Sequence, residues 1–351
     1  MASDGSTSYE VSAEAGTPRT VAQLAVGAMA AQVLGAATRL EIVEKIGDAE
    51  RTADELSAAC AAQPQAMGRL LRALAALGVL AERTPGRYAV TPAGEALDSR
   101  HPDSLHAFVR LFTDPVVLRA WELLDESVRT GETSFDGIFG ADFFAHLAER
   151  PELSEQFNSA MSQVTRGTAE ALPSAYDFGR FRTVADIGGG DGTLLAPVLR
   201  AHPALHGIIF DRAEGLAQAG ATLERAGLEG RCSLVAGDFF TGAPEGADLY
   251  MLKSVIHDWN DERCTDILRH CRRVIPDDGR LLIIEPVLPD AVDPAVAGIY
   301  LSDLNMLVNV GGRERTRDEF TQLCRGAGFA VRSVTPLPAP SRFSLIEAEP
   351  A

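Results

Sequence analysis

The stretch 183–193 constrains this chain most, because a run of glycines follows directly on a short apolar segment. Residues 183–187 have the composition of a buried strand, the glycines stand at 188, 189, 190 and 192, and 194–200 has a helical pattern. Strand, glycine turn and helix in this order open a nucleotide-binding βαβ unit. Glycine permits positive φ and lets a ligand approach the backbone. A tight connection alone is the alternative, but we predict a ligand site at Gly188 and Gly190.

Two residues distinguish this turn from a dinucleotide-binding loop. The dinucleotide fingerprint has Gly or Ala three positions after its second glycine, whereas this chain has Thr193. Asp186 lies inside the strand, two residues before the first glycine, where a carboxylate would not favour a pyrophosphate. A carboxylate suits a cationic ligand. The turn therefore predicts a sulfonium or ammonium ligand in place of NAD.

The next two strand-like runs end in residues that suit a nucleoside. Asp211 ends the run 207–211, 23 residues after Gly188, where an acid can accept both ribose hydroxyls. A helix cap is the alternative for such an acid. Asp238 and Phe239 follow the run 233–236, and a carboxylate beside an aromatic ring suits an adenine. Together with the glycine turn, these residues predict S-adenosylmethionine as the cofactor.

A histidine and two acids provide a candidate proton acceptor. His257 follows the strand-like run 247–252, Glu285 follows the run 280–284, and Glu314 lies in a later glycine-containing segment. Histidine suits proton transfer near neutral pH, and a phenol with a pKa of ~10 gains ~10²- to 10⁴-fold in rate from a base. A single histidine after a strand is often structural, but the two acids favour a catalytic role. We expect them to hold the other ring nitrogen of His257.

Two asparagines extend this region, and nothing in it indicates a metal. Asn305 and Asn309 are four residues apart in a helical segment, so they would share one face. No acidic cluster has a spacing that suggests metal ligands. We therefore predict catalysis without a metal ion.

The N-terminal half has the order of a winged-helix unit. A capping box at 52–55 precedes a short helix, 63–77 has helical spacing, and 78–90 reads as a hairpin around a Pro-Gly turn. Such a unit can bind DNA, but its second helix and wing carry only four arginines and the chain has a net charge of −17. Phosphate contacts need a basic face. We predict a dimerisation module and no nucleic-acid partner.

Composition changes along the chain suggest four segments. We expect a disordered tail at 1–18, a winged-helix-like dimerisation domain at 19–103, a helical substrate-lining region at 104–178, and an α/β catalytic domain of Rossmann-like type at 179–351. Phe157 and Met161 lie in the helical region and either reach the cleft or belong to the core. The apolar stretch Val21 to Ala37 is short for a membrane span, so we expect a helix buried against another helix.

The motifs together resemble a known family. From about Val21 to Ala348, the chain resembles the class I S-adenosylmethionine-dependent O-methyltransferases of the plant caffeate type and of bacterial polyketide and antibiotic tailoring. The resemblance rests on four motifs in order: Asp186-Ile187-Gly188-Gly189-Gly190, Gly237-Asp238-Phe239-Phe240, His257-Asp258-Trp259 and Gly311-Gly312-Arg313-Glu314-Arg315.

The resemblance implies a role for each matching position. It implies His257 as the base that accepts a proton from a small aromatic substrate, flanked by Glu285 and Glu314. It also implies a cytoplasmic homodimer without a membrane partner. The remaining implied roles are the methionine end of the cofactor for Gly188 and, near its carboxylate, Thr165; ribose for Asp211; adenine for Asp238 and Phe239; the same pocket for Lys253 and Trp259; and the substrate for Met161, Asn305 and Asn309.

Two other functions stay open at this point. Some proteins of this fold hydroxylate or decarboxylate anthracycline-like substrates, and the presence of His257, Glu285 and Glu314 favours methyl transfer over those reactions. A ligand-responsive regulator that uses the winged helix is the alternative from another class. The scarcity of basic residues counts against it.

Overall fold

The computed structural model describes residues 18–339 and 341–351, which form two compact units. One unit runs to Leu118 and includes Asp293–Ala297, and the other comprises Arg119–Val292 and Gly298–Ala351. The tail predicted at 1–18 lies outside the described residues except for Pro18. Within the described residues, no helix is long and apolar enough to cross a bilayer.

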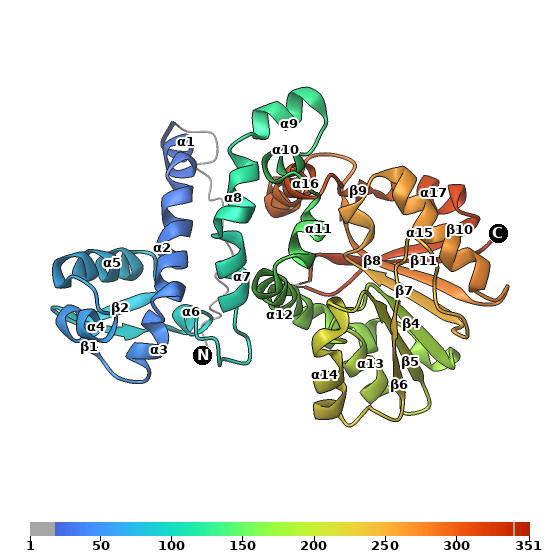
Figure 1. The fold of residues 1–351 in the computed structure, drawn as a ribbon, viewed down its shortest axis with the longest axis horizontal. Coiled ribbons are helices and arrows are strands. Elements are labelled where there is room, and N and C mark those ends of the chain that lie inside the picture. Colours follow the sequence, from blue (N-terminus) through green and yellow to red (C-terminus); the bar gives the residue numbers. More distant parts are fainter. Residues whose placement is uncertain (1–17, 340) are drawn as a thin grey trace, which may run out of the picture. The chain divides into compact units, whose positions relative to one another are not determined.

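The N-terminal unit combines short helices with a three-stranded antiparallel sheet in the order β1-β3-β2 (Figure 1). The predicted capping box is confirmed, because Thr52 and Glu55 each accept a backbone N–H from the other. The helix predicted at 63–77 and the hairpin predicted at 78–90 are present. The elements are α1 (Pro18–Ala25), α2 (Gly27–Arg39), α3 (Ile42–Ile46), β1 (Arg51–Thr52), α4 (Ala53–Ala59), α5 (Pro64–Ala76), β2 (Leu80–Thr84), β3 (Arg87–Val90), α6 (Pro92–Glu95) and α7 (His106–Phe112), and α8 (Pro115–Trp121) crosses into the second unit.

The first two helices correct one prediction. The stretch from Val21 was expected to form one helix buried against another, but α1 ends at Ala25 and α2 begins at Gly27. Val21, Leu24 and Met29 are 67%, 75% and 69% exposed. Their apolar side chains are therefore uncovered within the described chain.

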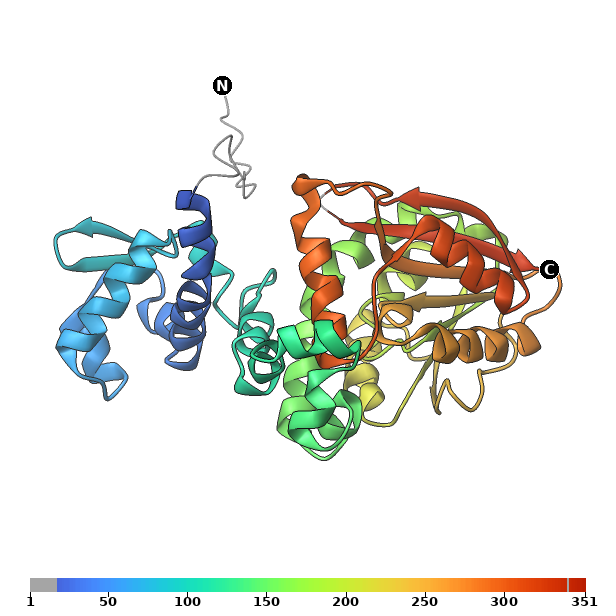
Figure 2. The same cartoon turned by 90° about the horizontal axis from the view of Figure 1, so that it is seen from above.

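The C-terminal unit is built on a mixed sheet in the order β10-β11-β8-β7-β4-β5-β6. Strands β4 to β8 are parallel, whereas β10 and β11 join antiparallel as the predicted closing hairpin and appear red in Figure 2. The elements are α9 (Leu124–Thr130), α10 (Ser134–Phe139), α11 (Phe143–Ala148), α12 (Pro151–Ala175), β4 (Thr183–Ile187), α13 (Leu195–Ala201), β5 (His206–Asp211), α14 (Ala219–Ala226), β6 (Cys232–Ala236), β7 (Leu249–Lys253), α15 (Asp261–Val274), β8 (Arg280–Leu288), α16 (Ala297–Asn309), β9 (Arg315–Thr316), α17 (Arg317–Gly326), β10 (Phe329–Pro336) and β11 (Phe343–Pro350).

Helices cover both faces of this sheet, because successive strand residues point to opposite sides. Met251 and Ile284 pack in a core with side chains of α12, α13 and α14. Leu252 and Ile283 pack in a second core with side chains of α15 and α17. The Rossmann-like α/β prediction is confirmed, and in such a sheet the carboxyl ends of the parallel strands form one edge where ligands bind.

One predicted strand end is wrong. Glu285 was expected just beyond its strand, but β8 continues to Leu288, so Glu285 lies inside it. The strand continues because Val287 and Leu288 pair in parallel with β9. Glu285 is consequently fully buried.

A buried arginine ties β9 to the segment that follows β7. The fully buried Arg315 donates to the carbonyl oxygens of Ile256 and Trp259, each at 2.8 Å, and to Asp261 Oδ1 at 2.8 and 3.0 Å. These bonds hold the chain on both sides of His257. Arg315 therefore fixes a loop that no regular strand or long helix supports.

We expect Arg315→Leu to lower the free energy of unfolding by about 2–4 kcal/mol, because it leaves buried carbonyl oxygens without a donor. Chemical unfolding in guanidinium chloride measures the change. The exposed Arg317 offers a matched control, and Arg317→Leu should change stability by no more than about 0.5 kcal/mol. Equal stability of the two variants would contradict this role for Arg315.

Candidate active site

The glycine turn after β4 has the backbone that its sequence predicts. Gly188, Gly190 and Gly192 have φ of +70°, +54° and +79°, a region that side chains rarely enter. The N–H of Gly188 donates to the carbonyl of Phe210 at 2.8 Å, which ties the turn to β5. A Cβ added at Gly190 would meet nothing within 4 Å. The backbone at Gly190 is thus open to a ligand.

Asp186 lies beneath this turn as a buried acid. It is 1% exposed, and neither of its oxygens has a hydrogen-bond partner among the described residues. Burial, with the nearby charge of Asp211, raises its pKa to about 8, although Lys253 opposes the shift. A cationic ligand would satisfy this acid, and cofactor binding by Asp186 stays a prediction.

Asp211 joins the end of β5 to the glycine turn. Its Oδ2 accepts the N–H of Gly190 at 2.9 Å and its Oδ1 accepts the N–H of Arg212 at 2.7 Å. Burial raises the pKa of Asp211, and these two bonds oppose the shift. The carboxylate is therefore held at the turn, as a ribose-binding acid would be.

Of the two predicted adenine residues, Phe239 lies beside the same turn. Asp238 accepts the N–H of Phe240 at 2.8 Å. The ring of Phe239 lies 3.8 Å from the Cβ position of Gly188, and its centroid is 6.2 Å from that of Trp259. The structure thus brings Phe239 to the glycine turn and Trp259 beside Phe239.

Lys253, at the end of β7, bridges two predicted regions. Its Nζ donates to Thr165 Oγ1 of α12 at 3.0 Å and lies 4.6 Å from the ring centroid of Phe343. Burial lowers the pKa of Lys253 to about 8, and the charges of Glu285 and Asp186 oppose the shift. Phe343 was not predicted as a site residue, because nothing in the sequence places β11, which pairs with β8, beside Lys253.

His257 lies in a short 3₁₀ segment after β7, between carboxylates. Its Nδ1 is 3.1 Å from Glu314 Oε1 and 3.5 Å from Glu285 Oε2, and its Nε2 is 3.6 Å from Asp258 Oδ1. A carboxylate can only accept, so Nδ1 carries a proton. Burial alone would lower the pKa of His257, but the charge of Glu285 and the hydrogen bond to Glu314 raise it to about 10.

Glu285 also shapes the backbone around His257. Its Oε1 accepts the N–H groups of Val255, Ile256 and His257 at 3.0, 2.9 and 3.3 Å. Burial raises the pKa of Glu285, and the charge of His257 opposes the shift. One carboxylate therefore positions both the ring and the loop of His257.

Three supporting residues were missed from the sequence. Ser302 Oγ donates to Glu314 Oε1 at 2.8 Å, and Asp303 Oδ1 accepts the N–H of Glu314 at 2.8 Å. Burial raises the pKa of Asp258 to about 7, with the charge of His257 opposing the shift. The spacing of Ser302 and Asn305 on one helix face was the available signal for Ser302.

The Gly311-Gly312 pair lets two backbones meet. The N–H of Arg313 donates to the His257 carbonyl at 2.9 Å. A Cβ on Gly312 would lie 2.1 Å from that carbonyl oxygen, a distance that real Cβ atoms do not reach. Glycine at 312 is therefore required by the approach of the His257 loop.

The predicted substrate-lining residues come from two helices. Phe157 of α12 packs against Phe143 and Phe144, with centroids 5.5 and 6.0 Å apart. On α16, Asn309 Nδ2 donates to Asn305 Oδ1 at 3.0 Å, which confirms their shared face. Met161 is half-buried. Substrate contact by these residues stays a prediction.

The ligand atoms of His257, Glu285 and Glu314 all lie within 4.8 Å of one another, a separation that could hold a metal ion. Hydrogen bonds already engage the facing atoms of His257 and Glu314. The expectation of catalysis without a metal stays a prediction.

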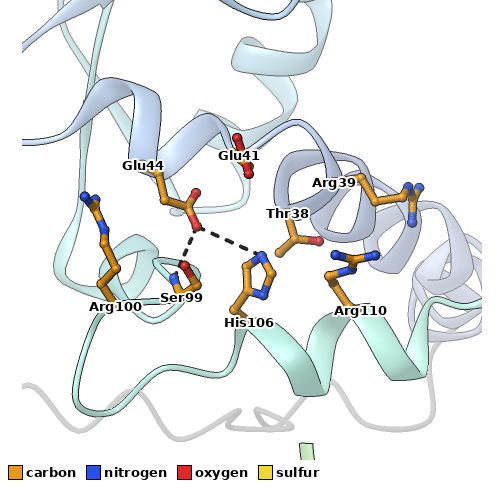
Figure 3. A pocket seen from close by; sticks show the side chains of 8 residues that line it. All are labelled: Thr38, Arg39, Glu41, Glu44, Ser99, Arg100, His106 and Arg110. Atoms are coloured by element: carbon orange, nitrogen blue, oxygen red, sulfur yellow. Dashed lines mark hydrogen bonds and ion pairs between the residues drawn. The ribbon is translucent and has the colours of Figure 1, made fainter. Parts of the chain in front are cut away.

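A separate hollow of about 310 Å³ lies in the N-terminal unit (Figure 3). Glu44 accepts the N–H of Ser99 at 3.2 Å there and lies 4.0 Å from His106. None of the predicted site residues lines it. Its lining consists of Thr38, Arg39, Glu41, Glu44, Ser99, Arg100, His106 and Arg110.

Comparison with known proteins gives consistent matches. The chain matches the model of the O-methyltransferase domain over residues 121–330 and that of the O-methyltransferase dimerisation domain over residues 22–99. It is 48% identical to O-demethylpuromycin-O-methyltransferase of Streptomyces alboniger, covering 97% of this chain and 91% of that one.

Solved structures agree with these matches. The structure of LaPhzM is similar with a TM-score of 0.90 and 40% identity, covering 95% of this chain and 99% of that one. A second similar structure is that of the neocarzinostatin-biosynthesis O-methyltransferase NcsB1, solved with S-adenosylmethionine and 2-hydroxy-5-methyl naphthoic acid. Its TM-score is 0.77 and its identity 32%, covering 92% of this chain and 96% of that one.

We expect NMR titration to place the pKa of the His257 ring well above 6.5, towards about 10. Glu314→Gln should lower this pKa, because it removes a negative charge that favours the imidazolium. The exposed Asp318 offers a control, and Asp318→Asn should leave the pKa unchanged.

The raised pKa of His257 also makes the stability of the folded protein depend on pH. Because the folded-state pKa is raised, the contribution of His257 to stability is fully present below pH 6.5 and is lost as the pH rises through about 10. A ring that titrates at or below 6.5 would contradict the described arrangement.

Proposed function

This chain belongs to the family of S-adenosylmethionine-dependent O-methyltransferases that modify secondary metabolites, and we propose that it methylates a phenolic hydroxyl of a small aromatic metabolite with His257 as general base. The observation that carries the proposal is the imidazole of His257 held at Nδ1 by Glu314 and Glu285. This arrangement leaves Nε2 as the nitrogen that can accept a proton.

S-adenosylmethionine supplies a methyl group activated by a sulfonium. We assign its ribose to Asp211 and its adenine to Asp238 and Phe239. The unpartnered Asp186 supports a cationic group near the turn, and the open backbone at Gly190 supports close approach. The other assigned residues are Gly188 and Thr165 at the methionine end, with Lys253 and Trp259 in the same pocket.

The raised pKa of His257 suits the proposed proton transfer. A phenol has a pKa of ~10, and the pKa of His257 is about 10, so the proton can move between them at little cost in free energy. Only neutral imidazole accepts a proton, and therefore the rate should rise with pH.

Glu285 and Glu314 stabilise the imidazolium that forms. Such a base contributes ~10²- to 10⁴-fold in rate. Alignment of the phenol oxygen with the methyl group supplies a further gain. We assign this alignment to Phe157 and Met161 of α12 and to Asn305 and Asn309 of α16.

We also propose that the protein is a homodimer. The dimerisation-domain match covers residues 22–99. Leu24 and Met29 within it are strongly exposed in the described chain, although burial of such side chains is worth about 1.5–3 kcal/mol each. A second copy of the chain would cover them.

Two variants should separate cofactor binding from proton transfer. We expect Asp211→Ala to abolish tight S-adenosylmethionine binding in isothermal titration. His257→Ala should bind the cofactor as wild type does but lose about 10²- to 10⁴-fold in kcat towards a methylated phenol. In the wild type, kcat/KM should rise with pH as His257 loses its proton.

The product and the controls decide between alternatives. Asp238→Asn and Asp258→Asn serve as controls, because each removes the negative charge of a neighbouring acid with minimal change of shape. A product that gains an oxygen atom or loses carbon dioxide would favour the hydroxylase or decarboxylase function. Full activity of His257→Ala would contradict the general-base assignment.

We expect Leu24→Glu to shift the protein from dimer to monomer in size-exclusion chromatography with light scattering, because it places a charge in an apolar contact. Gln65→Glu, at an exposed position of α5 in the same unit, is the charge-matched control and should remain dimeric. A wild type that runs as a monomer would refute the homodimer proposal.

A further inference from the structure

A chain of hydrogen bonds joins Trp121 to the two asparagines of α16. The Nε1 of Trp121 lies 3.0 Å from Asn305 Oδ1, and Asn309 Nδ2 lies 3.0 Å from the same oxygen. An indole N–H can only donate. The atom of Asn305 that faces Trp121 must therefore be its carbonyl oxygen, so Trp121 fixes the direction of an amide that could otherwise be reversed.

The same reasoning extends to Asn309. Because Asn305 presents an acceptor, Asn309 must present its NH₂ group, which turns its own Oδ1 away from Asn305. Asn309 is 2% exposed, and its Oδ1 is buried without a partner among the described residues. A buried carbonyl oxygen without a donor is unfavourable. A hydrogen-bond donor on a ligand would satisfy this oxygen.

The asparagines lie on the same helix face as Ser302, which supports the partner of His257. Ser302, Asn305 and Asn309 have the i, i+3, i+7 spacing of one face. Ser302 donates to Glu314, which bonds His257 Nδ1. Just beyond the C-terminal end of α16, the N–H of Arg313 donates to the His257 carbonyl. The amides thus lie along a helix that is joined to the His257 region through Ser302 near its middle and through the segment after its C-terminal end, with Asn309 about 10 Å along the axis from Ser302.

We propose that Trp121 is a specificity-determining residue. By fixing both amides, it makes Asn309 Oδ1 an acceptor and selects aromatic substrates that carry a second hydroxyl or amino group besides the hydroxyl that is methylated. Asn305 Nδ2 has no partner among the described residues and would donate to an oxygen of the same substrate. This inference rests on the proposed function, because it assumes that the substrate lies along α16.

Three naphthalene probes test the requirement for a donor: 2,7-dihydroxynaphthalene, 7-methoxy-2-naphthol and 2-naphthol. We would measure kcat/KM for methylation and, separately, the dissociation constant of each probe from the full-length protein saturated with S-adenosylhomocysteine. The wild type should bind the dihydroxy probe at least about 10-fold more tightly than the methoxy probe, because only the first offers a hydrogen to Asn309.

The decisive variant is Trp121→Phe, which keeps an aromatic ring but removes the N–H. Both amides can then reverse, and the preference should fall to about twofold, the factor expected from two equivalent hydroxyls. Affinity for S-adenosylhomocysteine should not change. Asn309→Ala removes the acceptor while Trp121 stays, and should abolish the same preference even if Trp121→Phe folds poorly.

The exposed neighbour Glu122 provides a matched control, and Glu122→Ala should keep the wild-type preference. Equal binding of the dihydroxy and methoxy probes by the wild type would overturn the inference, as would an unchanged preference in Trp121→Phe. A binding preference without methylation of any probe would support the inference and count against the proposed function.

Discussion

The candidate site depends on the carboxylate of Glu285. One of its oxygens accepts three consecutive backbone N–H groups, and the other lies 3.5 Å from the ring of His257. A buried charge, removed from water, is costly in free energy unless it is paired and hydrogen-bonded. The loop after β7 must therefore close around the carboxylate of Glu285. The buried carboxylate of Glu285, in the neighbouring strand β8, needs partners, and this need sets the position of His257.

The remainder of the loop is fixed by contacts from a distant part of the chain. Arg315 supports its carbonyl groups, and Gly312 allows the backbone after α16 to approach His257. Rigid support of this kind pre-organises a proton acceptor. Because the same segment also supplies Glu314, the helix, the glycines and the acid act as one positioning unit.

The sequence predicted what local patterns and strand ends can show. The glycine turn, the acid at Asp211 and the capping box at Thr52 are short-range signals, and the structure contains each feature. The sequence could not show that β8 continues past Glu285, because pairing with β9 is a long-range contact. Ser302 and Trp121 were missed for a similar reason, since their partners lie 12 and 184 residues away. The exposed face of α1 shows that apolar spacing alone does not say what covers a helix.

The buried carboxyl group of Asp186 has a consequence for turnover. With a pKa of about 8 despite the nearby charge of Lys253, it holds a proton at neutral pH. If a cationic group of S-adenosylmethionine binds beside it, the positive charge favours release of that proton. Where that group is the sulfonium, its conversion to a neutral thioether removes the attraction, whereas the α-ammonium would keep its charge. An acid beside the sulfonium would therefore favour retention of the methyl donor and departure of its spent form.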